Sequence, residues 1–273
     1  MSVHDQLGLN RVTKPQIPLP EFLKFAADSG FQFVEVRNDF TEKGVLDGLS
    51  QADLDKAFKA AGVKCLSINA VYPFDSAAHL KENLAKLKGL IAESKKIANP
   101  AIVFCPLNDA ADKRTSAQRA EELVAALDAY GPLLAEAKIT GLIEPLGFEV
   151  CSLRTKKAAL AGVAKSKYPQ VYKLVHDTFH HYLAGETEFF PAETGLIHVS
   201  GVLAGKAKSA IVDDDRLLVT KDDIMDNKGQ VATLLARGCK APVSYEPFSP
   251  RVRATELPEL KKQLKESVKF LLG

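Results

Sequence analysis

The segment Val171-Tyr-Lys-Leu-Val-His-Asp-Thr-Phe-His-His181 joins an apolar run of strand length to a polar end. The run delivers Asp177 to a turn of the chain, and His180 follows three residues later. This spacing places the two side chains on one face of a helix that is just beginning. The segment therefore has the features of a strand end that contributes to a site.

Three other strand-like runs also stop at a possible metal ligand. They are Gly141-Leu-Ile-Glu144, Thr194-Gly-Leu-Ile-His198 and Ala241-Pro-Val-Ser-Tyr-Glu246. These ligands and Asp177 are far apart in the sequence, so no local motif brings them together. If they meet, the fold must create the proximity.

Short apolar runs alternate with longer segments of helical period along the whole chain. We predict strands at residues 6–11, 31–37, 63–69, 100–105, 138–144, 171–176, 196–199 and 243–246. We predict helical segments at residues 18–29, 50–61, 77–98, 116–137, 155–165, 178–185, 221–237 and 258–272. This alternation is typical of parallel strands joined by right-handed crossovers.

Eight strand-then-helix units favour closure into an α/β protein of the (β/α)8 TIM-barrel class over an open sheet. No GxGxxG motif follows the first predicted strand, which argues against a dinucleotide-binding fold. No linker rich in Gly, Pro or Ser interrupts the chain. We therefore predict a single barrel domain over residues 1–273.

The composition is that of a globular protein in water. Hydrophobic residues are 46% of the chain, charged residues are 26%, and the formal net charge is +2. Basic and acidic residues are interspersed, so we expect no nucleic acid and no membrane among the partners. The start Met-Ser-Val-His-Asp-Gln lacks the features of a signal peptide, and no apolar run is long enough to span a membrane. These features predict a cytoplasmic protein.

The cysteines have no metal-binding or redox spacing, and we expect reduced, buried thiols. They are Cys65, Cys105, Cys151 and Cys239.

In a TIM barrel the active site lies at the carboxyl ends of the strands. Glu144, Asp177, His198 and Glu246 would end four consecutive strands on one side of that rim. Three carboxylates and one imidazole suit one divalent ion, Mn²⁺, Mg²⁺ or Co²⁺ more readily than a structural zinc, which favours thiolates. Zn²⁺ in a catalytic role stays open.

Polar residues also lie on the first two predicted strands, where an inward side chain would reach the pocket. These are Asn10, Glu35 and Arg37. The alternative for each is a hydrogen bond or a salt bridge inside the barrel.

Four segments resemble the metal site of the xylose isomerase-like barrel superfamily of sugar-phosphate isomerases and epimerases. They are Glu144-Pro-Leu-Gly-Phe-Glu149, His176-Asp177-Thr-Phe-His180, His198-Val-Ser and Tyr245-Glu246-Pro-Phe. Within that superfamily, three segments are most similar to 2-keto-myo-inositol (inosose) isomerases. They are Leu9-Asn-Arg-Val-Thr13, Val34-Glu-Val-Arg-Asn-Asp39 and the stretch from Glu144 to Thr155.

The resemblance implies a divalent metal held by Glu144, Asp177, His198 and Glu246, with a polyol or keto-sugar as substrate. Glu144 and Glu246 would be the catalytic pair, one removing a proton and the other returning it through a metal-stabilised enediolate.

The resemblance also implies that His180, Glu149 and Arg216 contact the substrate. Related enzymes often place the second glutamate six residues after the first, whereas Glu149 lies five after Glu144. The acidic residues 213–215 are alternative, surface ion partners for Arg216.

Several other functions remain open at this point. An inosose dehydratase, a ketose 3-epimerase and a hydroxypyruvate isomerase would use related chemistry on the same scaffold. An endonuclease IV-like phosphodiesterase would need more histidines than the 6 present, together with basic loops for DNA. A barrel that only binds a sugar is a further alternative, and a homo-oligomer is possible.

Overall fold

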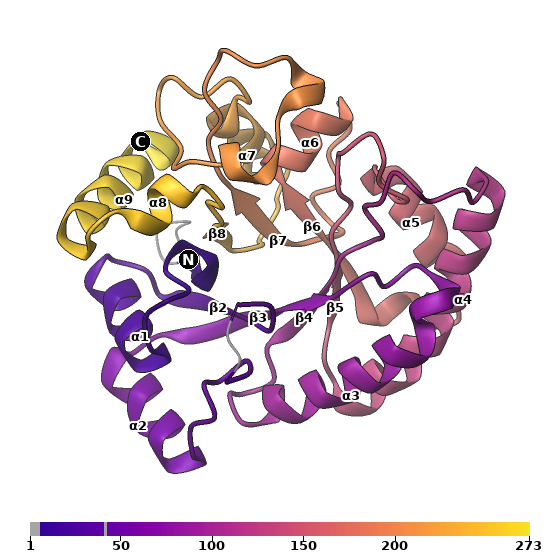
Figure 1. Cartoon of the computed structure of the whole chain (residues 1–273), viewed down its shortest axis with the longest axis horizontal. Coiled ribbons are helices and arrows are strands. Elements are labelled where there is room, and N and C mark those ends of the chain that lie inside the picture. The colour runs from indigo at the N-terminus through magenta and orange to yellow at the C-terminus, as the bar shows by residue number, and fades with distance from the viewer. Residues whose placement is uncertain (1–5, 41–42) are drawn as a thin grey trace.

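Eight parallel strands close into one barrel in the computed structural model, which describes residues 6–40 and 43–273 (Figure 1). The strands are β1 Leu7–Asn10, β2 Phe33–Arg37, β3 Lys64–Val71, β4 Ala101–Phe104, β5 Gly141–Ile143, β6 Tyr172–Asp177, β7 Thr194–Val199 and β8 Val243–Tyr245. Each strand pairs with its neighbours in the sequence, and β8 pairs with β1 through Gly8 and Ser244. The predicted (β/α)8 TIM barrel is confirmed.

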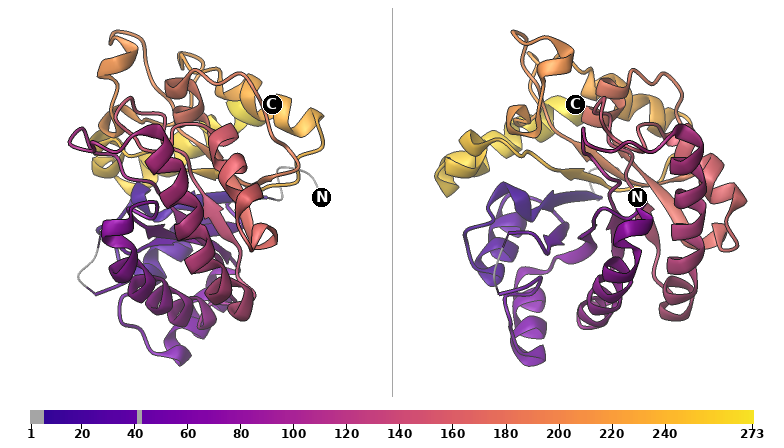
Figure 2. Two further views of the ribbon diagram at one scale, coloured as in Figure 1. Left: turned by 90° about the vertical axis from the view of Figure 1, so that its right-hand side faces the viewer. Right: turned by 45° about the vertical axis from the view of Figure 1, so that its right-hand side comes forward.

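The helices surround the barrel and carry the chain from each strand to the next (Figures 1 and 2). They are α1 Leu19–Asp28, α2 Gln51–Ala61, α3 Leu80–Lys95, α4 Ser116–Ala137, α5 Lys156–Lys165, α6 Thr178–Ala184, α7 Asn227–Ala236, α8 Pro250–Ala254 and α9 Leu257–Leu272. The last helix, α9, contacts α1, so the outer layer closes where the barrel does. No helix in the described part of the chain is both long enough and apolar enough to cross a bilayer.

Local sequence explains where several helices begin and end. Thr115 and Gln118 form a capping box at the start of α4, and Ser50 caps α2 through the Asp53 backbone N–H. Gly62 ends α2 with a φ of 69°, a left-handed conformation that glycine adopts without steric cost.

The predicted helix from residue 221 was wrong at its start. Asp226 accepts a hydrogen bond from the Gly229 N–H and so caps α7, which begins at Asn227. The predicted helix over 77–98 was also too long, because a 3-10 turn precedes α3 and Ala98 and Asn99 have positive φ values after it. The short α8 was not predicted; Ser249 caps it and Pro250 is its first residue.

The pleat of the strands separates two apolar layers. Ile102, Phe104, Ile143, Leu174 and Ile197 belong to the large core between the barrel and the helices. Their neighbours on the opposite face form a separate small cluster, which fills the barrel interior. This cluster contains Val103, Leu142, Val175 and Leu196.

The inward face of the strands also explains the location of the predicted ligands. Glu144, Asp177 and His198 each lie two residues beyond a member of the interior cluster. Because successive side chains of a strand point to opposite faces, a step of two residues keeps the side chain on the same face. The three side chains therefore point inward, one layer above the apolar interior.

Candidate metal centre

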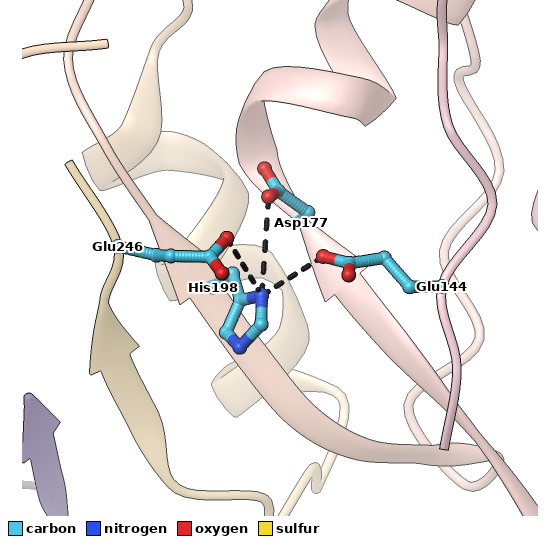
Figure 3. Close-up of side chains that lie close together, drawn as sticks. All are labelled: Glu144, Asp177, His198 and Glu246. Atoms are coloured by element: carbon cyan, nitrogen blue, oxygen red, sulfur yellow. Dashed lines mark hydrogen bonds and ion pairs between the residues drawn. The ribbon is translucent and has the colours of Figure 1, made fainter. Parts of the chain in front are cut away.

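The structure brings together the four residues that we predicted as metal ligands. Glu144, Asp177, His198 and Glu246 are all buried, and one ligand atom of each lies within 4.8 Å of the others. Figure 3 shows Glu144 and Glu246 approaching the imidazole from opposite sides, with Asp177 on a third side. We call these four residues the quartet.

The three carboxylates of the quartet lie around Nδ1 of His198. This nitrogen lies 2.9 Å from Glu144 Oε1, 3.2 Å from Glu246 Oε2 and 3.9 Å from Asp177 Oδ2 (Figure 3). His198 Nδ1 and one oxygen from each carboxylate therefore face a common point.

Asp177 has a second role as the N-cap of α6. Its Oδ1 accepts hydrogen bonds from the backbone N–H of Phe179 at 2.7 Å and of His180 at 3.4 Å. This capping holds the carboxylate in one orientation. The other oxygen of Asp177, Oδ2, faces the other three members of the quartet.

The opposite nitrogen of His198, Nε2, faces Glu35 on β2. It lies 3.1 Å from each oxygen of that carboxylate. Burial alone would lower the pKa of His198. The surrounding carboxylates of Glu246, Glu35 and Glu144 outweigh burial and raise this pKa well above its ordinary value.

Glu246 is held by three cationic or amide groups besides His198. Its Oε1 accepts hydrogen bonds from Asn10 Nδ2 at 3.0 Å and from Arg37 at 2.8 Å, and its Oε2 lies 2.9 Å from Arg216. Burial opposes ionisation of Glu246, but the cations His198, Arg216 and Arg37 lower its pKa. Glu246 is therefore ionised at neutral pH.

Arg216 lies against the quartet and is 1% exposed. Its guanidinium is 2.6 Å from Asp177 Oδ2 as well as 2.9 Å from Glu246 Oε2, and it donates to Ser200 Oγ at 3.0 Å. Asp213 also pairs with it at 3.2 Å. The surface ion pair considered above is thus only one of its contacts.

A cavity of about 240 Å³ reaches Glu144 and Glu246. His180 lines it, with Nδ1 accepting from the Gly147 N–H at 3.2 Å and the ring packed edge-on against Phe148. The other lining residues are Arg37, Asn69, Tyr72, Cys105, Asn108, Leu146, Phe148, Asp213, Arg216 and Phe248.

The predicted substrate contacts divide into three groups. His180, Arg37 and Arg216 line the cavity, whereas Asn10 contacts Glu246 and caps its own turn through the Val12 N–H. Glu149 is exposed and lines a neighbouring cavity with Lys208. The chain turns at residues 148–150, with Phe148 packed on His180, so the structure does not bring Glu149 to the quartet.

Sequence reasoning missed two contacts of the quartet. Glu35 was placed on an inward strand face, but nothing in the sequence indicated His198 as its partner. The Cys105 thiol was predicted only to be buried, and it donates to Glu144 Oε2 at 3.4 Å. Burial and the Glu144 charge raise the pKa of Cys105 well above its ordinary value.

The quartet fits a divalent cation by its chemistry. Its ligand atoms are three carboxylate oxygens and one imidazole nitrogen, and hard divalent ions bind such oxygen-rich sets. Each of the four residues is at most 4% exposed. Buried carboxylates need nearby positive charge, and a divalent ion would add to that of Arg37 and Arg216.

The chain is similar to known proteins in sequence and in fold. A family described as xylose isomerase-like TIM barrel matches residues 23–272. A xylose isomerase domain-containing protein from Salmonella typhimurium LT2 is 30% identical, with a TM-score of 0.90 and coverage of 100% of each chain. A search of curated proteins produced no match.

Two further solved structures have the same fold at lower identity. The IOLI protein, solved with a binding zinc atom, has a TM-score of 0.87 at 20% identity over 97% of this chain and 98% of its own. D-psicose 3-epimerase from Clostridium cellulolyticum H10, solved with D-tagatose, has a TM-score of 0.74 at 14% identity over 97% and 98%. At these identities the likeness describes the fold.

Proposed function

Since the chain belongs to the xylose isomerase-like TIM barrel family, we propose that it is a divalent-metal-dependent isomerase or epimerase of an unphosphorylated keto-cyclitol or ketose. The observation that carries this proposal is the arrangement of the quartet. Two buried glutamates face the same imidazole from opposite sides and line one cavity. A substrate between them has a carboxylate on each side of a reacting carbon.

We propose that Glu144, Asp177, His198 and Glu246 hold the ion. When bound, a divalent ion supplies a Lewis acid that stabilises negative charge on the substrate oxygens. The IOLI protein, which has the same fold and was solved with a binding zinc atom, supports a metal-binding role for this barrel. We propose Mn²⁺, Mg²⁺, Co²⁺ or Zn²⁺ as the native ion.

Glu144 and Glu246 are the proposed proton-transfer groups. One takes the proton from the carbon next to the carbonyl and the other returns a proton to the neighbouring carbon or to the opposite face. Their surroundings differ, because Glu246 is held by Arg37, Arg216 and Asn10, whereas Glu144 contacts the Cys105 thiol. Because two guanidinium groups hold Glu246, whereas the contacts of Glu144 are with Cys105 and His198, we assign proton removal to Glu144.

The charges around the cavity favour an uncharged substrate. Arg37 is paired with Asp39 and Glu246, and Arg216 with Asp177, Glu246 and Asp213. Neither guanidinium is left over to neutralise a phosphate.

Polar groups that suit substrate hydroxyls also line the cavity, namely Asn69, Asn108 and His180. We propose His180 and Arg216 as substrate contacts, and Asn10 and Arg37 as groups that hold Glu246.

The test is proton exchange in D₂O. The metal-loaded protein is incubated with 2-keto-myo-inositol, and NMR follows deuterium entry at the carbon next to the carbonyl together with the product. We expect exchange by the wild type and exchange about 10²- to 10⁴-fold slower by Glu144→Gln. If a protein shown to bind metal exchanges no proton of any cyclitol or ketose tested, the proposal is refuted.

A further inference from the structure

We propose that Glu35 is a positioning residue of the metal centre, which in the metal-bound protein holds the neutral His198 ring with its proton on Nε2 and its lone pair on Nδ1. This inference rests on the proposed metal-binding role of the quartet and adds a residue from outside it. Glu35 lies on β2, three strands around the closed barrel from β7, which carries His198. It therefore reaches His198 across the barrel interior.

The side chains of Glu35 and His198 are in hydrogen-bond contact and fully buried. Both Glu35 oxygens lie 3.1 Å from His198 Nε2, and both residues are 0% exposed. Glu35 is therefore the hydrogen-bond partner of this buried nitrogen.

Glu35 is itself held by donors from two other strands. Ser244 Oγ on β8 donates to Oε1 at 2.5 Å, and Ser67 Oγ on β3 donates to Oε2 at 2.5 Å. Asn69 Nδ2 donates to Oε2 at 3.1 Å. Three donors from β3 and β8 thus fix the direction in which this carboxylate points.

This hydrogen bonding determines the tautomer of His198. A carboxylate that receives donors on both oxygens acts only as an acceptor, so His198 Nε2 must donate to it. The proton of a neutral imidazole then lies on Nε2, and the lone pair lies on Nδ1. That nitrogen is the one facing Glu144 and Glu246, at 2.9 and 3.2 Å.

A carboxylate behind a metal-binding histidine has two effects on the ion. It keeps the ring in the orientation that binds, and it makes the binding nitrogen more basic. Loss of such a partner typically weakens metal affinity about 10- to 100-fold. Ser67 and Ser244 support the same arrangement one contact further away.

The experiment compares zinc affinity in the wild type and in Glu35→Gln by competition with a chelator. Glutamine keeps the size but loses the charge, so we expect zinc to bind about 10- to 100-fold more weakly. The matched control is Ser267→Ala, which removes a buried hydroxyl that donates to the Val219 carbonyl at 2.6 Å, away from the quartet. Its zinc affinity should equal that of the wild type.

A second readout is ¹⁵N NMR of the zinc-loaded wild type, in which the His198 proton should be on Nε2. If Glu35→Gln does not fold, Ser244→Ala replaces it, with a smaller but measurable loss of affinity expected. Wild-type zinc affinity retained in either folded variant, or a proton found on Nδ1, overturns the role of Glu35 alone. A wild type that binds no divalent ion overturns the proposed function as well.

Discussion

Replacing Arg216 with methionine tests the balance of charge at the metal centre. The guanidinium contacts Asp177 at 2.6 Å and Glu246 at 2.9 Å, and the three side chains are at most 3% exposed. Methionine retains much of the packing against Phe179 and Phe248 but leaves both carboxylates without this partner. Removing one partner of a buried ion pair typically costs about 3–5 kcal/mol.

The expected loss is measured by thermal or urea unfolding in the presence of a chelator. For a domain of this size, about 3–5 kcal/mol corresponds to a melting temperature lower by about 6–20 °C. A saturating divalent ion supplies the missing positive charge. We therefore expect the ion to raise the melting temperature of the variant by more than it raises that of the wild type.

The matched control is Lys24→Met. Lys24 and Asp28 form an ion pair of the same length, 2.6 Å, but their side chains are 73% and 47% exposed. Water screens this pair, so the unfolding curve should superimpose on that of the wild type. If Arg216→Met loses less than about 1 kcal/mol, as an exposed pair would, or loses the same stability with and without the ion, the reasoning is refuted.

Three further predictions concern the two glutamates, His198 and the cysteines. Glu144→Gln and Glu246→Gln should each lower kcat about 10²- to 10⁴-fold, measured by NMR as product formation, because each removes a group that moves a proton. Activity within about tenfold of the wild type would contradict the assignment. The metal-free protein should lose stability as the pH rises above about 6.5. Folding raises the pKa of His198, so protonated His198 contributes its full stabilisation below the pKa of the unfolded chain. This contribution is lost as the pH rises through the pKa of the folded protein. Thermal unfolding in chelator across pH 6–9 checks this, and a profile in His198→Gln identical to that of the wild type would be contrary evidence. The native protein should react slowly with iodoacetamide at pH 7.5, because burial raises the pKa of all four thiols, Cys65, Cys105, Cys151 and Cys239. After unfolding, mass spectrometry should find all four alkylated.

Sequence patterns alone were sufficient to predict the barrel and the quartet. The strand-and-helix alternation predicted eight units, and a ligand at the end of each of four consecutive strands indicated a shared site. Both inferences rest on short stretches of sequence. The alternation of side chains within a strand shows which residues face inward, and a helix between two strands makes those strands parallel. Asp177 is the clearest example, since the sequence places it where an apolar strand ends and a helix begins, as the structure does.

The partners of those residues were decided by the closure of the barrel. Nothing near Glu35 in the sequence indicates His198, and nothing near Arg216 indicates that it pairs with Asp177 rather than only with its acidic neighbours. The predicted substrate contact of Glu149 met the same difficulty, because this residue lies in an exposed turn after β5 and lines a different cavity from the quartet. A strand's own pattern says which face a side chain lies on. The side chain that it meets across the interior depends on how all eight strands are arranged around the barrel.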